Sequence, residues 1–220
     1  FGAVSWYGPP PQIRFALTFM TVPNETTSAA SPLSSPPTSR WVSWNGCLMV
    51  ILLATLARLA FVIWLCPVEL SGDEAQYWDW SRRLDWSYYS KGPGVAWTIA
   101  PSTGLFGPSD WSVRLPAVIC AVVATLAMAR LTMDVAAARG CTPTQVARAG
   151  LGGTLAFTLF VGYQFSGVAM TIDGPHMAWW LLACWAAFRA FYAWHVGRSG
   201  MAAWLALGAA IGIGMLFKYT

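Results

Sequence analysis

The stretch NGCLMVILLATLARLAFVIWLC, residues 45–66, contains one charged side chain, Arg58, in an otherwise almost wholly apolar run. About 20 consecutive apolar residues are enough for an α-helix to cross the hydrocarbon core of a bilayer. The stretch is therefore predicted to span a membrane, and this decides the class of fold in which the remaining segments have to be placed.

The composition of the whole chain supports a membrane protein. Hydrophobic residues make up 56% of the 220 residues and charged residues 10%, against about 25% charged in typical soluble domains. The mean hydropathy is +0.51. The net charge of +4 is spread thinly, without the cluster of Lys and Arg that would follow a nucleic-acid backbone, so nucleic acid is not an expected partner. The five Cys form no CxxC pair and are expected to be packing residues.

Further apolar runs predict an all-α integral membrane protein, a multi-spanning helical bundle. The additional spans are expected at roughly 115–135, 149–169, 174–194 and 201–217. A shorter apolar piece from Pro93 to Phe106 is interrupted by Pro101 and Gly104, which favours an interfacial or re-entrant helix over a span.

Charge predicts how the bundle is oriented. The segment 67–114 holds six of the nine acidic residues, whereas the opposite ends of the spans carry mostly Arg. By the positive-inside rule, the segment 67–114 is expected to be a long extracytoplasmic loop of a multi-pass protein of the plasma (inner) membrane. Alternation of the spans then places Asp173 and Lys218 on the same outer side.

The sequence at the two ends of the chain leads to further predictions. Residues 1–40 are rich in Pro, Ser and Thr and are predicted to be a disordered cytoplasmic tail. Met20 is a candidate start, in which case residues 1–19 are not native. Because the chain opens on Phe1 and stops directly after an apolar run, residues 41–220 are expected to be the N-terminal part of a longer membrane domain.

The loop begins with a helix-start signal, Ser71-Gly72-Asp73-Glu74. This S-x-x-E pattern is a capping box, so a capping role alone is one interpretation of Glu74. Asp73 falls in the first turn, where the helix dipole favours an ionised carboxylate, and Tyr77 and Trp80 are expected on the same face. A carboxylate beside aromatic rings at a membrane surface suits a sugar hydroxyl, whose proton the carboxylate accepts.

The segment Tyr88-Tyr89-Ser90-Lys91-Gly92-Pro93 is predicted to be a turn that presents one cation. Lys91 suits a phosphate oxygen, and the alternative is an interfacial Lys that pairs with lipid head groups; the loop alone does not choose between them. Arg58 has two interpretations as well, a contact to a lipid phosphate or an internal salt bridge or bond to backbone carbonyls. The internal interpretation is favoured.

Asp173 and His176 are spaced to share a metal ion, and Asp173 is equally placed to cap a helix that starts at Gly174-Pro175. Two ligands without a third seldom make a site, so no metal site is predicted, although a divalent cation stays open as a cofactor.

These motifs together resemble the GT-C glycosyltransferases, specifically the bacterial relatives of protein O-mannosyltransferases and of aminoarabinose (lipid A) transferase. The resemblance covers roughly residues 45–220, in order and spacing. It rests on Asp73-Glu74 with the aromatic helix after it, on the turn from Tyr88 to Pro93, and on three later motifs, Val113-Arg114-Leu115-Pro116, Thr171-Ile172-Asp173-Gly174-Pro175 and Lys218-Tyr219-Thr220.

The resemblance implies a GT-C bundle with short interfacial helices in its first outer loop. It also implies inverting transfer of a sugar from a polyprenyl-phosphate donor to a lipid, glycan or protein acceptor. Asp73 would be the catalytic base, and the residues implied to bind substrate are Lys91, Tyr88, Tyr77, Asp173 and Lys218. Two departures stand out: Gly92 replaces the family's Pro, which is expected to loosen the turn, and Ser90 replaces an acid that is a metal ligand in some relatives.

A membrane transporter or flippase for a lipid-linked or anionic substrate is the alternative function. Transporters usually carry ionisable groups or broken helices near the middle of the bilayer. Arg58 is the clear mid-span charge here, while the acids gather in the loop, which favours chemistry at the membrane surface.

Overall fold

The computed structural model describes residues 39–89 and 91–219, with side chains from Trp44 onward, and these ranges are helical apart from loops and one isolated bridge between Tyr88 and Lys91. The predicted tail over residues 1–40 lies almost wholly outside the described residues. Within them the expected all-α fold is present.

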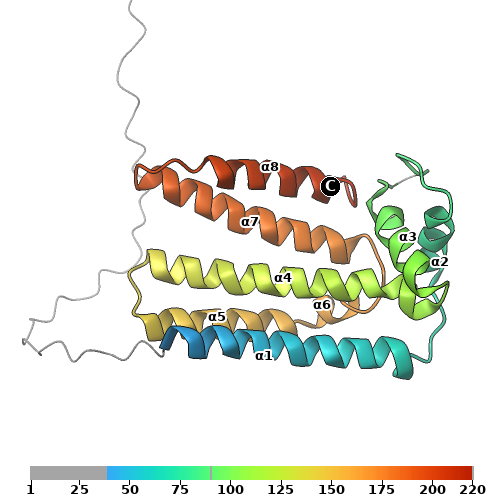
Figure 1. Cartoon of the computed structure of the whole chain (residues 1–220), viewed down its shortest axis with the longest axis horizontal. Helices are drawn as coiled ribbons and strands as arrows, with labels where there is room; N and C mark the ends of the chain where they lie inside the picture. Colours follow the sequence, from blue (N-terminus) through green and yellow to red (C-terminus); the bar gives the residue numbers. More distant parts are fainter. Residues whose placement is uncertain (1–38, 90, 220) are drawn as a thin grey trace, which may run out of the picture. The chain divides into compact units, whose positions relative to one another are not determined.

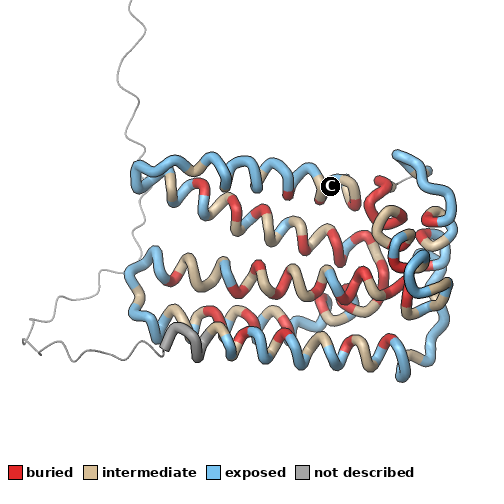
Figure 2. Tube along the Cα trace, viewed as in Figure 1, coloured by how far each residue is buried: buried red, intermediate tan, exposed pale blue. Residues whose placement is uncertain are grey.

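Five long helical segments lie side by side (Figure 1). They are α1 (Ser39–Ala60) with its π-helical continuation η1 (Phe61–Leu65), α4 (Asp110–Ala138), α5 (Pro143–Leu159), α7 (Asp173–His195) and α8 (Met201–Met215). The central helix is α4, which contacts α1, α5 and α7, while α8 packs on α7. Buried residues follow α4 along its length (Figure 2). Many of them are Ala, whose small side chain lets neighbouring helices approach closely.

Among the described residues, two helices are long and apolar enough to cross a membrane, Trp44–Leu65 and Asp110–Ala138, and α8 is a shorter apolar helix. Large apolar side chains such as Leu52, Leu53 and Leu56 are exposed on α1. A soluble surface rarely shows so large an apolar face, whereas lipid contacts favour it. The structure thus supports a membrane protein, and the number of five spans stays a prediction.

The expected span over 149–169 is not one helix. α5 starts early, at Pro143 after the capping residue Thr142, and ends at Leu159. The extended backbone of Phe160 (φ −66°, ψ 114°) separates it from the short α6 (Val161–Ser166). The prediction of a continuous helix was therefore wrong. Phe160 and Val161 at the break are exposed, whereas Thr158 before it and Tyr163 after it are buried.

Two short helices cover one end of the bundle. α2 (Gly72–Ser81) and α3 (Gly94–Phe106) pack against each other, and α3 packs on α4 (Figure 1). α3 occupies the apolar piece that was expected not to span, and it contains Pro101. This end also holds the start of α7 and the C-terminus of α8, because successive long helices run in opposite directions.

Candidate functional site

The site is built outward from the first turn of α2. Ser71 Oγ accepts a hydrogen bond from the Glu74 N–H (3.4 Å), and Glu74 Oε2 accepts one from the Ser71 N–H (3.0 Å), so both bonds of the capping box are present. The two adjacent acids of this turn differ in exposure: Glu74 is 1% exposed, whereas Asp73 lies at the surface.

Glu74 is much more than a cap. Its Oε1 accepts from Arg114 Nε (2.9 Å) and from the Met170 N–H (2.9 Å), and its Oε2 accepts from Arg114 Nη2 (2.9 Å). Arg114 also donates to the carbonyls of Val68 (3.1 Å) and Glu69 (3.0 Å). This buried pair therefore joins α2, the first turns of α4 and the segment before α7.

The electrostatics of Glu74 follow from these bonds. Burial alone would raise the pKa of its carboxyl, but the hydrogen bonds from Arg114 and from the N–H groups of Ser71 and Met170, with the charge of Arg114, outweigh burial and lower the pKa. A carboxylate held ionised with both oxygens engaged is poorly suited to accept another proton. Arg114 was noted in the sequence only as part of a motif, although a buried Arg at the start of an apolar helix calls for an acidic partner.

Asp73 has an exposed carboxylate, and among the residues described it makes no side-chain hydrogen bond or ion pair. It lies near Tyr77, whose pKa is raised mainly by burial and further by the negative charges of Asp73 and Asp173. The negative charges of Asp73, on α2, and Asp173, on α7, therefore both raise the pKa of the Tyr77 hydroxyl.

Tyr77 itself is 3% exposed and packs in a hydrophobic cluster with Val95, Ile99 and Phe217. The Tyr77 ring is therefore almost wholly covered in this structure, and its part in binding substrate, implied by the resemblance, stays a prediction. Trp80 is half-buried, and its ring lies 5.5 Å from that of Tyr77, measured between centroids.

The turn that carries Lys91 is closed by its own backbone. Tyr88 and Lys91 exchange two N–H···O bonds of 3.1 Å each. The Tyr88 ring stacks on Trp80 with centroids 4.7 Å apart, and the Tyr88 hydroxyl accepts from the Asp85 N–H and lies 3.1 Å from the Trp80 carbonyl. Tyr88 thus holds the loop in place. Within the described ranges the Lys91 ammonium has no hydrogen bond or ion pair, and its side chain is half-buried.

Two glycines dock this turn on the C-terminus of α8. The Gly94 N–H donates to the Leu216 carbonyl (2.9 Å), and a Cβ on Gly92 would lie 2.1 Å from the same oxygen. Glycine at position 92 permits this close backbone contact, and the expectation that it loosens the turn stays a prediction. The contact brings the turn beside Lys218.

Lys218 and Asp173 form an ion pair across α7 and α8, with Nζ 3.0 Å from Oδ1 and both side chains partly exposed. α7 begins at Asp173, and its capping position, Ile172, makes no side-chain bond, so the alternative of Asp173 as a helix cap was wrong. His176 Nδ1 lies 3.2 Å from the Gly214 carbonyl. Among the described residues, no group of three or more His, Cys, Asp or Glu side chains is placed to hold a metal ion.

The structure thus gathers at one end of the bundle four predicted charges that are far apart in the chain, Asp73, Lys91, Asp173 and Lys218. The links that hold them there are the Glu74–Arg114 pair, the Gly94–Leu216 bond and the Asp173–Lys218 pair. An exposed carboxylate and two lysines at such a surface can accept a proton and neutralise an anionic leaving group.

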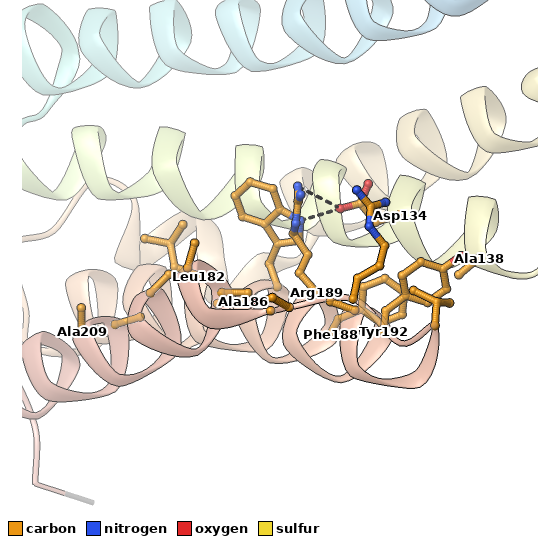
Figure 3. A pocket seen from close by; sticks show the side chains of 18 of the residues that line it. Asp134, Ala138, Leu182, Ala186, Phe188, Arg189, Tyr192 and Ala209 are labelled. Carbon is orange, nitrogen blue, oxygen red and sulfur yellow. Dashed lines mark hydrogen bonds and ion pairs between the residues drawn. The ribbon is translucent and has the colours of Figure 1, made fainter.

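A large cavity lies elsewhere, between α4, α7 and α8 toward the other end of the bundle, with a volume of about 860 Å³ (Figure 3). Asp134 in its wall accepts from Trp185 Nε1 (2.8 Å) and lies 4.0 Å from Arg189. None of the predicted site residues lines it.

Comparison with known proteins agrees with the arrangement of motifs. The sequence model of the family described as Dolichyl-phosphate-mannose-protein mannosyltransferase matches residues 90–220, more than half of the chain. The lipid A galacturonosyltransferase RgtD of Rhizobium johnstonii is 43% identical over 58 residues, which are 24% of this chain and 12% of that protein. The match therefore spans only a small part of this curated relative. No solved structure gives a significant match to the chain.

Proposed function

Because the chain belongs to the dolichyl-phosphate-mannose-protein mannosyltransferase family, we propose that it is part of a membrane glycosyltransferase that uses Asp73 as its catalytic base. The observation that carries this proposal is that two adjacent acids differ in their burial and their hydrogen bonds. Glu74 is buried with both oxygens engaged, whereas Asp73 has an exposed carboxylate at the same end of the bundle as two lysines, and its charge, like that of Asp173, acts on Tyr77.

In the proposed reaction, an acceptor hydroxyl on a lipid, glycan or protein gives its proton to Asp73 as its oxygen attacks the anomeric carbon. The bond between that carbon and the phosphate oxygen of a polyprenyl-phosphate donor breaks, and the phosphate leaves with the electron pair. One base and departure on the opposite face predict inversion through an oxocarbenium-like state, as in inverting glycosidases.

Lys91 is the better placed cation for the donor phosphate. Lys218 already has Asp173 as its partner, whereas Lys91 has no such partner in the described part of the chain. A charge-assisted bond from Lys91 would strengthen as negative charge develops on the leaving phosphate, which is the condition for lowering the barrier. The acid-rich segment 67–114 supports an extracytoplasmic location of this site in a multi-pass protein of the plasma membrane.

The proposal is tested with the complete protein in liposomes that contain a polyprenyl-phosphate donor with a radiolabelled sugar. Asp73→Asn is compared with Asp79→Asn, a matched exposed acid on α2 that pairs with Arg82. We expect the first variant to lose labelled product by roughly 10²–10⁴-fold and the second to retain it. Equal transfer by Asp73→Asn and wild type would rule out Asp73 as the base.

A transporter or flippase is the second candidate, and one observation favours it. Arg58 is a buried cation in α1, and the broken helix at Phe160 lies beside it. Broken helices with ionisable neighbours are typical of transporter binding sites. Movement of the labelled lipid across the liposome membrane without any glycosylated product would select this function over transfer.

A further inference from the structure

The cavity between α4, α7 and α8 is separate from the site proposed for sugar transfer. Its walls are formed by these three helices and by the loop that joins α7 to α8 (Figure 3). Its volume of about 860 Å³ falls within the range of about 300–1,000 Å³ that is typical of ligand sites. None of the residues assigned to sugar transfer lines it, so a ligand bound here would serve a different purpose.

Two accessible cations line this cavity, Arg189 on α7 and Arg198 in the loop after it. The Arg189 side chain is 60% exposed and lies 4.0 Å from Asp134, and the exposed Arg198 side chain makes no hydrogen bond or ion pair with the described residues. Arg58, by contrast, is 5% exposed and donates to the side-chain oxygen of Gln164, where a salt bridge or a bond to backbone carbonyls was expected. The two arginines of the cavity are therefore the cations that a ligand can reach.

The charges of the lining favour an anion. Asp134 is the acid in the wall; it accepts from Trp185 Nε1 (2.8 Å) and faces Arg189 (Figure 3). Two arginines and one aspartate leave one positive charge in excess, and the exposed hydroxyl of Ser199 adds a further donor. Guanidinium groups match the geometry of phosphate oxygens well. A phosphodiester, with one negative charge, fits this end of the cavity.

The rest of the cavity is apolar. Ala202, Ala206 and Ala209 lie four and three positions apart on α8, so they share one side of the helix, and all three are exposed to the cavity that they line. From Ala202 to Ala209 this wall is about 10 Å long, at about 1.5 Å per residue. A polar end beside an apolar wall of this length suits an amphipathic ligand with a hydrocarbon chain.

The surroundings of the cavity are those of a membrane surface. Aromatic side chains are exposed around the loop between α7 and α8, as expected where a protein crosses the boundary between lipid and water; they are Phe191, Tyr192, Trp194 and Trp204. The segments 130–148 and 189–200, which meet this end of the bundle, contain five Arg and one acid. By the positive-inside rule this end faces the cytoplasm, where the membrane leaflet carries anionic lipids.

We propose that this cavity binds an anionic glycerophospholipid of the cytoplasmic leaflet. Arg189 and Arg198 donate to its phosphate oxygens, and an acyl chain lies along the alanine wall of α8. Basic pockets between membrane helices on the cytoplasmic side bind lipid head groups through the same chemistry. The site lies toward the opposite end of the bundle from Asp73, and lipid binding here does not depend on sugar transfer.

The test is lipid binding to the complete protein, delipidated in a phosphate-free detergent and followed by native mass spectrometry. The probes are dioleoyl phosphatidylglycerol, dioleoyl phosphatidylcholine with the same chains but no net charge, undecaprenyl phosphate as the carrier lipid, and inorganic phosphate. We expect saturable binding of one phosphatidylglycerol, with binding of phosphatidylcholine about 10-fold weaker.

Variants make the assignment specific. Arg189→Gln and Arg198→Gln are each expected to weaken binding of phosphatidylglycerol about 10-fold, by loss of a charge-assisted bond. Asp134→Asn is expected to tighten it about threefold, because the substitution removes the negative charge from the wall while the amide oxygen still accepts from Trp185. The matched control is Arg148→Gln, since Arg148 is an exposed arginine on α5 outside the cavity, and this variant is expected to bind like wild type.

Four results would overturn the proposal. They are equal binding of phosphatidylglycerol and phosphatidylcholine, displacement of phosphatidylglycerol by a lower concentration of undecaprenyl phosphate, binding of inorganic phosphate alone, and equal affinities in the Arg198→Gln and Arg148→Gln proteins. Because Arg198 and Arg148 are both exposed, both variants are expected to fold, so this comparison stands even if Arg189→Gln disturbs the contact with Asp134.

Discussion

Replacing Glu74 with Gln is expected to lower the free energy of unfolding by about 3–5 kcal/mol. The carboxylate accepts four hydrogen bonds, two on each oxygen, from Arg114 Nε and the Met170 N–H on one side and from Arg114 Nη2 and the Ser71 N–H on the other. A Gln amide has one acceptor oxygen, so in either orientation two of these donors would face an NH₂ group. Arg114 would also be left as a buried charge without a counter-ion.

Two lost bonds to a charged group, at about 1.5–3 kcal/mol each, give about 3–6 kcal/mol, which contains the range of about 3–5 kcal/mol typical of breaking a buried ion pair. The assay is unfolding of the complete protein in detergent micelles, followed by Trp fluorescence. Glu69→Gln is the matched control, because Glu69 is exposed and its contact with Arg114 uses the backbone carbonyl, which the substitution keeps. If Glu74→Gln unfolds like wild type, or if both variants lose the same stability, the reasoning about the buried pair is refuted.

Three further predictions concern the same end of the bundle. Lys91→Met is expected to raise the KM for the polyprenyl-phosphate donor about 10- to 100-fold by loss of a charge-assisted bond, as measured by initial rates against donor concentration. Gly92→Ala is expected to lower the unfolding midpoint, because its Cβ would meet the Leu216 carbonyl at 2.1 Å; Gly104→Ala, with no atom within 4 Å, is expected to leave the midpoint unchanged or higher. Because its pKa is lowered in the folded state, Glu74 stabilises the protein fully above the unfolded pKa of about 4.3, and this stabilisation is lost as the pH falls through the folded pKa. Wild type is therefore expected to lose more stability than Glu74→Gln when unfolding is measured between pH 6 and pH 3.

The features that depend on residues close together in the sequence were predicted best. The capping pattern at Ser71 depends on residues three apart, and the helix it predicts begins where expected. The apolar stretch over 45–66 and the short piece before Phe106 also correspond to helices, because apolar length is itself a local property. The interpretation of Glu74 as a cap alone missed its larger part, since its main partner, Arg114, is 40 positions away.

Features that depend on packing were not predicted. The break at Phe160 falls in a run without Pro, so no residue in it forbids a helix, and Gln164 is a polar residue within that apolar run. Gly92 was interpreted from its flexibility, whereas its role depends on a carbonyl from the far end of the chain. Tyr77 was expected at the surface from its helical position. In the structure it is buried, because α3 and the segments around Met170 and Phe217 pack against it.

The most direct test of Asp73 as the base is the single-turnover rate of sugar transfer at saturating donor, measured for wild type and Asp73→Asn together with the donor Kd of each. The account predicts a rate at least about 100-fold lower in the variant, with a donor Kd within about twofold of wild type, because the carboxylate acts on the acceptor proton and not on the donor phosphate. A variant that transfers the sugar at the wild-type rate would contradict the account, as would one whose defect lies wholly in donor binding.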